Sequence, residues 1–373
     1  MNLDPLRRSR PVWNGLAFAG EALGLGPRML LHAGPPFASP GEPSAPVLSS
    51  AVLACRHEGW ASTDEEAENL IRSDVVRLLP AQDFGAVTPL AEVVSPSTPL
   101  TRVADLGDPS TQAWAPLSSG SGPQMRFGTR NPAVLARHAW REQTLFPALR
   151  AALAEPVELL EPARQGLDRG DDLHGSTACA TTALAEILDR RLGTDTASRE
   201  TRAMLAQSPL FFLTLWMAAC RVMMLAAADS MPTVLLALAG NGKDVGILLG
   251  GDPSAWTRVG GAPPEGELAH GQAPAEVCPM IGDSGVIDIA GFGGQRLRDA
   301  PAARCLETRH PGLDARVGLD ARTLVAKELQ PQVHIGMIGA DGRTGLMGRG
   351  LYRPPLALFR AAITDRTART TPR

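Results

Sequence analysis

The strongest constraint on the fold is that a long apolar helix pattern is followed directly by a hairpin pattern. Residues 210–228 are apolar for most of their length and are interrupted by Arg221, which favours a buried helix over a membrane span. Residues 233–239 and 245–249 then flank an Asn-Gly turn, which predicts an antiparallel hairpin. An antiparallel pair after a block of helices favours an α+β fold over the doubly wound parallel sheet of a Rossmann fold.

The length of 373 residues exceeds that of one ordinary domain. We therefore expect an N-terminal α/β domain (1–155), a small central helical domain (156–232) and a C-terminal α+β domain with glycine-rich loops (233–373). Hydrophobic residues make up 44% and charged residues 20%, as in globular proteins. The formal charge of -3 gives no electrostatic reason to expect nucleic acid or an anionic membrane as a partner.

Five cysteines are scattered along the chain without a C-x-x-C pair. This pattern favours reduced thiols in a cytoplasmic protein over a disulfide framework. The first ten residues have arginines but no apolar segment behind them, so a signal peptide is not expected.

Local patterns predict the remaining elements. The expectations are a helix within 1–29, a buried strand and loop over 29–36, helices over 47–60, from residue 64 and over 131–153, a strand over 75–79, short strands over 90–94 and 100–104, loops over 252–275, a short strand over 286–290 and glycine-rich turns over 334–350.

The first candidate site lies at the start of a predicted helix within 166–193. Asp171, Asp172 and His174 precede this helix and are followed by small residues that let a ligand approach. Helix capping explains one aspartate, because a carboxylate satisfies the free amides at a helix start. A second aspartate and a histidine are more than a cap requires, so we predict a ligand or catalytic site.

Two glycine-rich loops and one arginine extend this prediction. Asp283 and Ser284 lie in the loop 281–294, where the Gly293 and Gly294 amides could cradle an anion. Arg349 lies in the loop 334–350. Neither loop has the spacing of a dinucleotide or Walker motif, and no cofactor is expected. Arginines suit anions because their planar fork matches a carboxylate or phosphate. Arg126, which follows a glycine-serine segment, is a second arginine that could bind an anion. The simpler interpretation is that these loops only close turns and that the arginines are solvated.

Taken in order, these motifs resemble the YlbE-like family, whose best-described members are the AllG subunit of a three-part oxamate carbamoyltransferase. The similarity runs from about residue 30 to residue 359. The matching motifs are Leu30 to Pro36, Glu58-Gly59-Trp60-Ala61, Met125-Arg126-Phe127-Gly128, Gly170-Asp171-Asp172-Leu173-His174, Phe211-Phe212-Leu213, Asn241-Gly242, Gly282-Asp283-Ser284 and Gly318-Leu319-Asp320.

The resemblance implies an intracellular multidomain α+β protein that works with an FdrA-type, acyl-CoA-synthetase-like subunit and a third small subunit. The reaction it implies is carbamoyl transfer between oxamate and phosphate, within allantoin catabolism and purine degradation. Such chemistry needs oxyanion donors, an anion clamp and a group that moves a proton. The candidate catalytic residues are Asp171, Asp172, His174 and Asp283; the candidate substrate-binding residues are Arg126, Asn241, Ser284, Gly293, Gly294 and Arg349.

The sequence also departs from the family pattern. His334 stands where relatives usually have asparagine, Gly339 stands where they have histidine, and Asp288 replaces a common glutamate. Residues 298–318 also lack most of a helix. These departures leave two alternatives open, a non-catalytic scaffold that docks an FdrA-like partner and a divergent branch acting on another small amide. A metal requirement and a homodimer are left open by the sequence.

Overall fold

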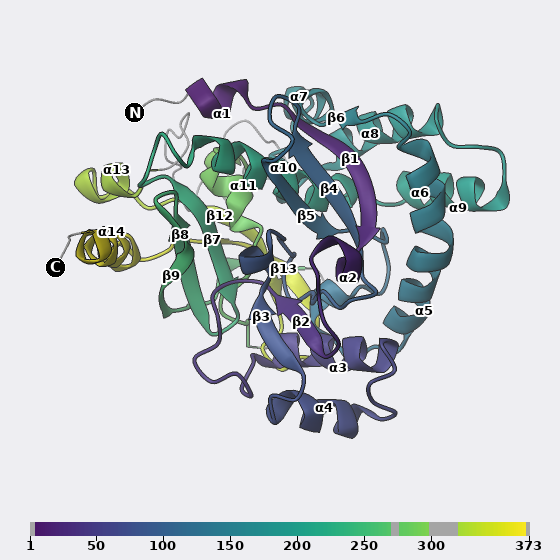
Figure 1. Cartoon of the computed structure of the whole chain (residues 1–373), viewed down its shortest axis with the longest axis horizontal. Helices are drawn as coiled ribbons and strands as arrows, with labels where there is room; N and C mark the ends of the chain where they lie inside the picture. Colours follow the sequence, from purple (N-terminus) through teal and green to yellow (C-terminus); the bar gives the residue numbers. More distant parts are fainter. Residues whose placement is uncertain (1–3, 270–275, 298–319, 371–373) are drawn as a thin grey trace.

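The computed structural model describes residues 4–269, 276–297 and 320–370, and the α+β class is confirmed (Figure 1). The departure noted at 298–318 lies outside the described residues. Within them the strands are β1 Pro11–Phe18, β2 Met29–His32, β3 Arg77–Pro80, β4 Pro99–Asp105, β5 Gln112–Pro116, β6 Val157–Glu158, β7 Leu235–Asn241, β8 Asp244–Leu249, β9 Asp252–Gly260, β10 Glu265–Leu268, β11 Ile281–Gly282, β12 Val333–Ile338 and β13 Leu346–Tyr352.

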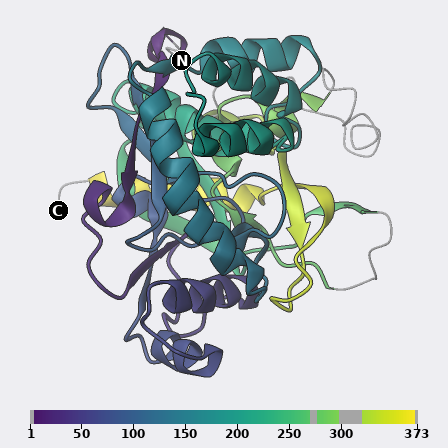
Figure 2. The ribbon, with the colours of Figure 1, turned by 90° about the vertical axis from the view of Figure 1, so that its right-hand side faces the viewer.

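Helices cover these strands on several sides. They are α1 Asp4–Arg8, α2 Ala19–Ala22, α3 Ala45–His57, α4 Asp64–Arg72, α5 Ala133–Trp140, α6 Phe146–Ala152, α7 Leu160–Asp168, α8 Ala178–Asp189, α9 Thr196–Ala206, α10 Phe211–Ala227, α11 Gly285–Ile289, α13 Ala321–Ala326 and α14 Leu356–Thr370. The shorter turns are η1 Ala81–Phe84, η2 Met125–Phe127, the π-helical η3 Arg141–Leu145, and η4 Gly293–Gln295. Figure 2 shows α5, η3 and α6 as one long helix, coloured blue to teal.

The first antiparallel sheet has the strand order β5-β4-β1-β6. The helix expected within residues 1–29 was largely wrong, because β1 occupies its centre and pairs with β4 from Pro11 to Phe18. Val12 and Trp13 are buried in that strand. Their burial between β4 and β6 outweighs the local helical preference, as tertiary packing commonly does.

Helix α10 is the buried helix expected over residues 210–228. Almost all its side chains are buried, and it packs against β4 and β5 on one side and against β7 and α11 on the other. Arg221 donates to the Leu236 carbonyl at 2.5 Å, which satisfies one of its buried nitrogens. Among the described residues no single helix is long and apolar enough to cross a membrane; α9 and α10 meet that criterion only together, as a pair bent by 83°.

The expected hairpin is confirmed as β7 and β8, which lie in a sheet of order β11-β7-β8-β9. Two loop expectations were wrong. The segment 252–275 contains β9, paired with β8, and β10, paired with β13. The segment 334–350 contains most of a second hairpin, β12 and β13, because its glycines alternate with residues such as Ile335 and Met347 that are buried.

The strand expected over residues 286–290 was also wrong, because these residues form the short helix α11. The Val286 and Ile287 amides donate back to the Asp283 and Ser284 carbonyls, which closes a helical turn. Gly285 allows α11 to lie against β7, since a Cβ there would come within 2.1 Å of the Leu238 carbonyl oxygen. The close packing of Gly285 against β7 therefore outweighs the strand preference of the β-branched residues that follow it.

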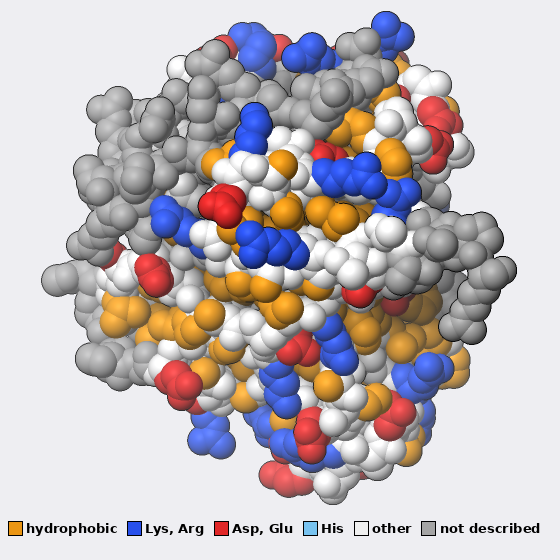
Figure 3. Space-filling model, turned by 90° about the vertical axis from the view of Figure 1, so that its left-hand side faces the viewer, with side chains coloured by type: hydrophobic (Ala, Val, Ile, Leu, Met, Phe, Trp, Pro, Cys, Tyr) orange, Lys and Arg blue, Asp and Glu red, His pale blue; other side chains and the backbone are white. Residues whose placement is uncertain are grey.

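Residues from all three expected domains contribute to one continuous hydrophobic cluster, for example Leu30, Phe212 and Val286. The boundaries at 155/156 and 232/233 therefore stay a prediction. On the coloured part of the face shown in Figure 3, arginines and lysines are interspersed with acidic and hydrophobic side chains.

The substitution Gly34→Ala is expected to lower the free energy of unfolding by roughly 3 kcal/mol or more. Gly34 has φ +81°, and a Cβ would lie 2.4 Å from the Gly240 carbonyl carbon, where only backbone could give way. The matched control is Gly59→Ala, because Gly59 has φ +70° and open space around it. Its cost is the left-handed backbone alone, about 1–2 kcal/mol. Equal losses for both variants in urea unfolding would contradict the close-contact argument.

Candidate functional site

One partly open cavity lies where segments from distant parts of the chain meet. Its volume is about 100 Å³. The turn before α8, the turn η2, the start of α10, the loop before α11 and both strands β12 and β13 contribute to its wall. The lining residues are Pro89, Leu90, Arg126, Phe127, His174, Gly175, Leu210, Leu213, Ser284, His334, Ile335, Gly336, Leu346 and Arg349.

The first of two carboxylate–imidazole pairs joins Asp172 to His334. The His334 Nδ1 atom lies 2.5 Å from Asp172 Oδ2, and both side chains are almost completely buried. Asp172 also accepts the amides of His174 (3.2 Å) and Ser176 (2.7 Å) in its own turn. Burial opposes ionisation of Asp172, but the His334 charge and these hydrogen bonds outweigh burial and lower the Asp172 pKa.

The second pair joins His174 to Asp288. The His174 Nδ1 atom lies 2.7 Å from Asp288 Oδ2. Asp288 Oδ1 accepts the amides of Gly294 (2.7 Å) and His334 (3.1 Å). The two pairs are therefore crossed: the turn before α8 supplies the histidine of one pair and the aspartate of the other. We call these four residues, Asp172, His174, Asp288 and His334, the crossed pairs.

The crossed pairs direct both imidazoles at the cavity in a defined way. Each Nδ1 faces a carboxylate, so the proton on that side is fixed and Nε2 is left for a ligand. The ring centroids are 6.4 Å apart, and His334 Nε2 is buried without a hydrogen-bond partner. A carboxylate-held imidazole with a free Nε2 can accept a proton from a substrate and return it.

Small residues make room for these rings. A Cβ on Gly175 would lie 2.0 Å from His334 Cε1. A Cβ on Gly293, at φ +56°, would lie 2.5 Å from Asp288 Oδ1. Both positions therefore require glycine in this arrangement.

Arg126 and Arg349 give the lining of the cavity positive charge. Arg126 is 8% exposed, and its Nε atom has no hydrogen-bond partner. Burial lowers its pKa to about 10, with Glu92 opposing the shift and Arg349 adding to it. Arg349 is exposed at the cavity mouth on β13. A guanidinium that is buried with an unsatisfied donor suits a carboxylate or phosphate ligand.

The other residues singled out in the sequence lie around this cavity in different ways. Ser284 lines it, as do His174, Arg126 and Arg349. Asp171 accepts from the Ala180 amide and the Ser176 hydroxyl, which ties the turn to α8. The Gly293 and Gly294 amides donate to the Asp172 carbonyl oxygen and to Asp288, so they hold the crossed pairs together.

Asn241 and Asp283 lie outside the cavity wall. The Asn241 side chain donates to the Pro35 carbonyl (2.9 Å) and accepts two amides of the β7–β8 turn. Asp283 accepts from the Gly34 amide (3.0 Å), the Gln82 amide group (2.9 Å) and the Thr88 amide (2.9 Å). The structure thus brings Asp172 and His174 together, whereas Asn241 and Asp283 lie outside the cavity wall and join loops. Their functional assignments stay predictions.

Asp288 and His334 were missed as site residues, although the sequence marked both as departures from the family pattern. The signal in the sequence was that both changed positions belong to the glycine-rich segments 281–294 and 334–350. Two histidines outside the cavity have other partners. His32 Nδ1 lies 2.7 Å from the Ala33 carbonyl, and His57 pairs with Glu142 rather than with its neighbour Glu58. Within the described residues no three or more His, Cys, Asp or Glu side chains have the arrangement of a metal site.

The substitution Asp283→Asn is expected to change how stability depends on pH. Burial raises the Asp283 pKa from 3.8 to about 6, against its three hydrogen bonds and Arg221. The folded state therefore holds this proton more tightly than the unfolded state does. This group makes the free energy of unfolding fall as pH rises from about 4 to about 6, by about 3 kcal/mol in total.

Asparagine does not titrate, so the variant should lose this fall even if its lost hydrogen bonds lower stability at every pH. Urea unfolding of both proteins between pH 4 and pH 7 measures the difference in slope. If the free energies of unfolding of the two proteins change with pH in parallel, Asp283 is already ionised in the folded state at pH 4 and the prediction is contradicted.

The sequence matches a known protein family and two proteins of Escherichia coli K12. The family model described as oxamate carbamoyltransferase subunit AllG matches residues 76–284. The chain is 30% identical to oxamate carbamoyltransferase subunit AllG of Escherichia coli K12, over 97% of this chain and 95% of that protein. It is 25% identical to the uncharacterized protein YahG of the same organism, over 97% of this chain and 84% of that protein.

A solved structure shares the fold. It is a conserved protein of unknown function from Enterococcus faecalis V583, with a TM-score of 0.88, 21% identity, and coverage of 98% of this chain and 96% of that chain. The family model spans more than half of the described chain, and the sequence identity extends over nearly all of it. The chain is therefore a divergent member of the family of oxamate carbamoyltransferase AllG subunits.

Proposed function

We propose that this chain is a subunit of an oxamate carbamoyltransferase-type complex and that its cavity binds the small carboxylate-bearing amide of that reaction. The observation that carries the proposal is that two carboxylate-held imidazoles and the buried Arg126 line the same cavity of about 100 Å³. A cavity of this size suits a substrate of a few heavy atoms and excludes a nucleotide. The charge of its wall suits an anion.

The substrate's carboxylate has a natural partner in this arrangement. Arg126 presents a buried guanidinium with a free Nε donor, and Arg349 adds a second positive charge at the mouth. An unpaired buried charge is costly, so an anionic ligand that pairs with it gains more than it would at the surface. The carboxylate of oxamate or oxalurate would then fix the amide end toward the histidines.

The imidazoles supply the proton that carbamoyl transfer requires. In the direction from oxalurate to oxamate, a phosphate oxygen attacks the carbamoyl carbon, and the bond from that carbon to the oxamate nitrogen breaks. The leaving nitrogen takes a proton from the Nε2 atom of a protonated histidine. In the reverse direction, neutral Nε2 accepts the amide proton as the new bond forms.

We assign this step to His174. Its Nδ1 proton is held by Asp288, which is fixed in turn by the Gly294 and His334 amides. His334 takes the place of a residue that is usually asparagine in relatives, so we assign it a positioning role beside the substrate. Ser284 also lines the cavity and is proposed as a further substrate contact.

The catalytic assignment predicts that Asp288→Asn lowers turnover of the reconstituted complex by about 10²-fold or more. Asparagine can keep the two amide bonds through its oxygen, but its NH2 group then faces His174 Nδ1. The ring must become an acceptor there, which puts its proton on Nε2 and removes the base. His174→Gln should produce a loss of similar size.

The matched control is Asp195→Asn, which removes a carboxylate that only caps α9. Asparagine caps a helix about as well as aspartate, so its turnover should equal that of the unmodified complex. Steady-state rates at saturating substrate, with melting temperatures alongside, give the comparison. Full turnover in both Asp288→Asn and His174→Gln would favour the alternative of a non-catalytic scaffold.

We also propose that an FdrA-like synthetase-type subunit and a third small subunit complete the enzyme in the cytoplasm. The purified chain alone is then expected to form carbamoyl phosphate at less than about one hundredth of the rate of the full complex, because a separated site lacks the oriented second reactant. Assays of the chain with and without its partners measure the ratio. Comparable rates would contradict the dependence on partners.

A further inference from the structure

Two smaller cavities also have Arg126 in their walls. One has a volume of about 50 Å³ and is lined by Ser118, Gly120, Ser121, Gln124, Arg126, Ser208, Pro209, Leu210 and Phe211. The other has about 10 Å³ and is lined by Glu92, Leu117, Ser118, Ser119, Gln124, Met125, Arg126, His138, Arg141 and Thr214. They share Ser118, Gln124 and Arg126, so the Arg126 guanidinium is a wall common to all three cavities.

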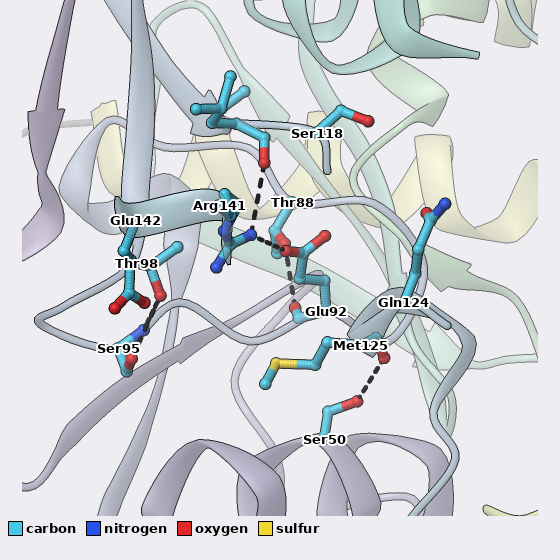
Figure 4. A network of polar contacts seen from close by, with 12 residues as sticks. Ser50, Thr88, Glu92, Ser95, Thr98, Ser118, Gln124, Met125, Arg141 and Glu142 are labelled. Carbon is cyan, nitrogen blue, oxygen red and sulfur yellow. Dashed lines mark hydrogen bonds and ion pairs between the residues drawn. The ribbon is translucent and has the colours of Figure 1, made fainter. Parts of the chain in front are cut away.

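Arg141 brings a second buried guanidinium to this region. It begins the π-helical turn η3, and π-helical turns are frequent at functional sites. Its NH1 atom lies 3.2 Å from the Glu92 carboxylate and 3.4 Å from the Leu117 carbonyl. Figure 4 shows the Arg141 side chain pointing at Glu92, with Ser118 and Gln124 nearby. Although Arg141 is 2% exposed, its Nε and NH2 atoms have no hydrogen-bond partner.

The buried charges here do not balance. Glu92 is the carboxylate facing both Arg126 and Arg141, and burial raises its pKa against the attraction of the two arginines. Arg349 adds positive charge next to Arg126. Two buried guanidinium groups thus share one carboxylate that is itself harder to ionise. Such a surplus is unfavourable unless an anion joins the cluster.

The loop from Ser118 to Gly122 is arranged to receive an anion rather than to repel one. Its carbonyl oxygens are occupied, because Arg137 binds those of Ser119 and Ser121 and the Gln124 side chain binds that of Gly120. The Ser118 hydroxyl accepts the Gly120 amide at 3.3 Å, so its own hydrogen is left to donate. Ser118 and Arg126 both line the larger cavity and can donate hydrogen bonds to an anion there.

We propose that the larger of these two cavities is a second oxyanion subsite, in which Arg126 and the Ser118 hydroxyl bind a small tetrahedral oxyanion of the phosphate class, with Arg141 adding positive charge from the adjoining smaller cavity. The inference rests on the proposed function, because it gives the second reactant a place beside the first. Arg126 contacts both subsites and holds the two anions on either side of one positive charge. The volume of about 50 Å³ exceeds that of a single water site and excludes a nucleotide.

Calorimetric titration of the full chain with inorganic phosphate, sulfate and oxamate tests the subsite. Ser118→Asp keeps an acceptor for the Gly120 amide but places a carboxylate against the arginines, and it should weaken phosphate binding at least 10²-fold. Ser118→Asn has the same shape without the charge and should stay within about fivefold of the unmodified chain. Ser121→Asp, which adds a carboxylate at an exposed position of the same cavity, should weaken phosphate binding about tenfold without disturbing the core.

Oxamate separates this inference from the proposed function. Oxamate binding should be weakened much less than phosphate binding in Ser118→Asp, because the added carboxylate lies in the second cavity, and saturating oxamate should not abolish phosphate binding. A chain that does not bind phosphate, equal binding by the Asp and Asn variants, or direct competition between phosphate and oxamate would overturn the second subsite. If the unmodified chain binds phosphate but does not bind oxamate, the assignment of the first cavity is overturned instead.

Discussion

Two buried aspartates hold the centre of this protein together, and most of the site depends on them. Asp172 accepts amides of its own turn and the imidazole of His334 on β12. Asp288 on α11 accepts the backbone amide of His334 and the imidazole of His174. Each carboxylate thereby joins a backbone segment to a side chain from another segment. Carboxylates are tolerated at such depth because several hydrogen-bond donors replace the water they lost.

This arrangement explains which features could be predicted from the sequence and which could not. The buried helix α10 and the β7–β8 hairpin follow from local periodicity and an Asn-Gly turn. The cluster of Asp172 and His174 was visible because its members are neighbours in the chain. Their partners Asp288 and His334 lie 114 and 162 residues away, so only tertiary structure could pair them. Asp283 looked equivalent to Asp172, and its place behind the cavity wall had no local signal.

The errors in secondary structure have a similar origin. In β1, Val12 and Trp13 are buried between two strands that local periodicity could not place. The short helix α11 forms although three of its five residues are β-branched, because Gly285 lets the helix approach β7. The glycine-rich segment around β12 and β13 was expected to form turns, although its Gly348 and Gly350 lie where the neighbouring strand β10 comes close. Glycine marks both turns and close packing, and the sequence alone does not separate them.

The contact between Gly175 and the His334 ring also limits how this branch of the family can change. A side chain at position 175 and an imidazole at position 334 cannot coexist, since even a single Cβ would overlap the ring. A chain with a smaller residue at position 334 has no such restriction. The histidine could therefore be acquired only on a background that already had glycine at position 175, and once it was in place that glycine could no longer be exchanged. The packing of the His334 ring therefore requires that the glycine at position 175 came before the histidine at position 334.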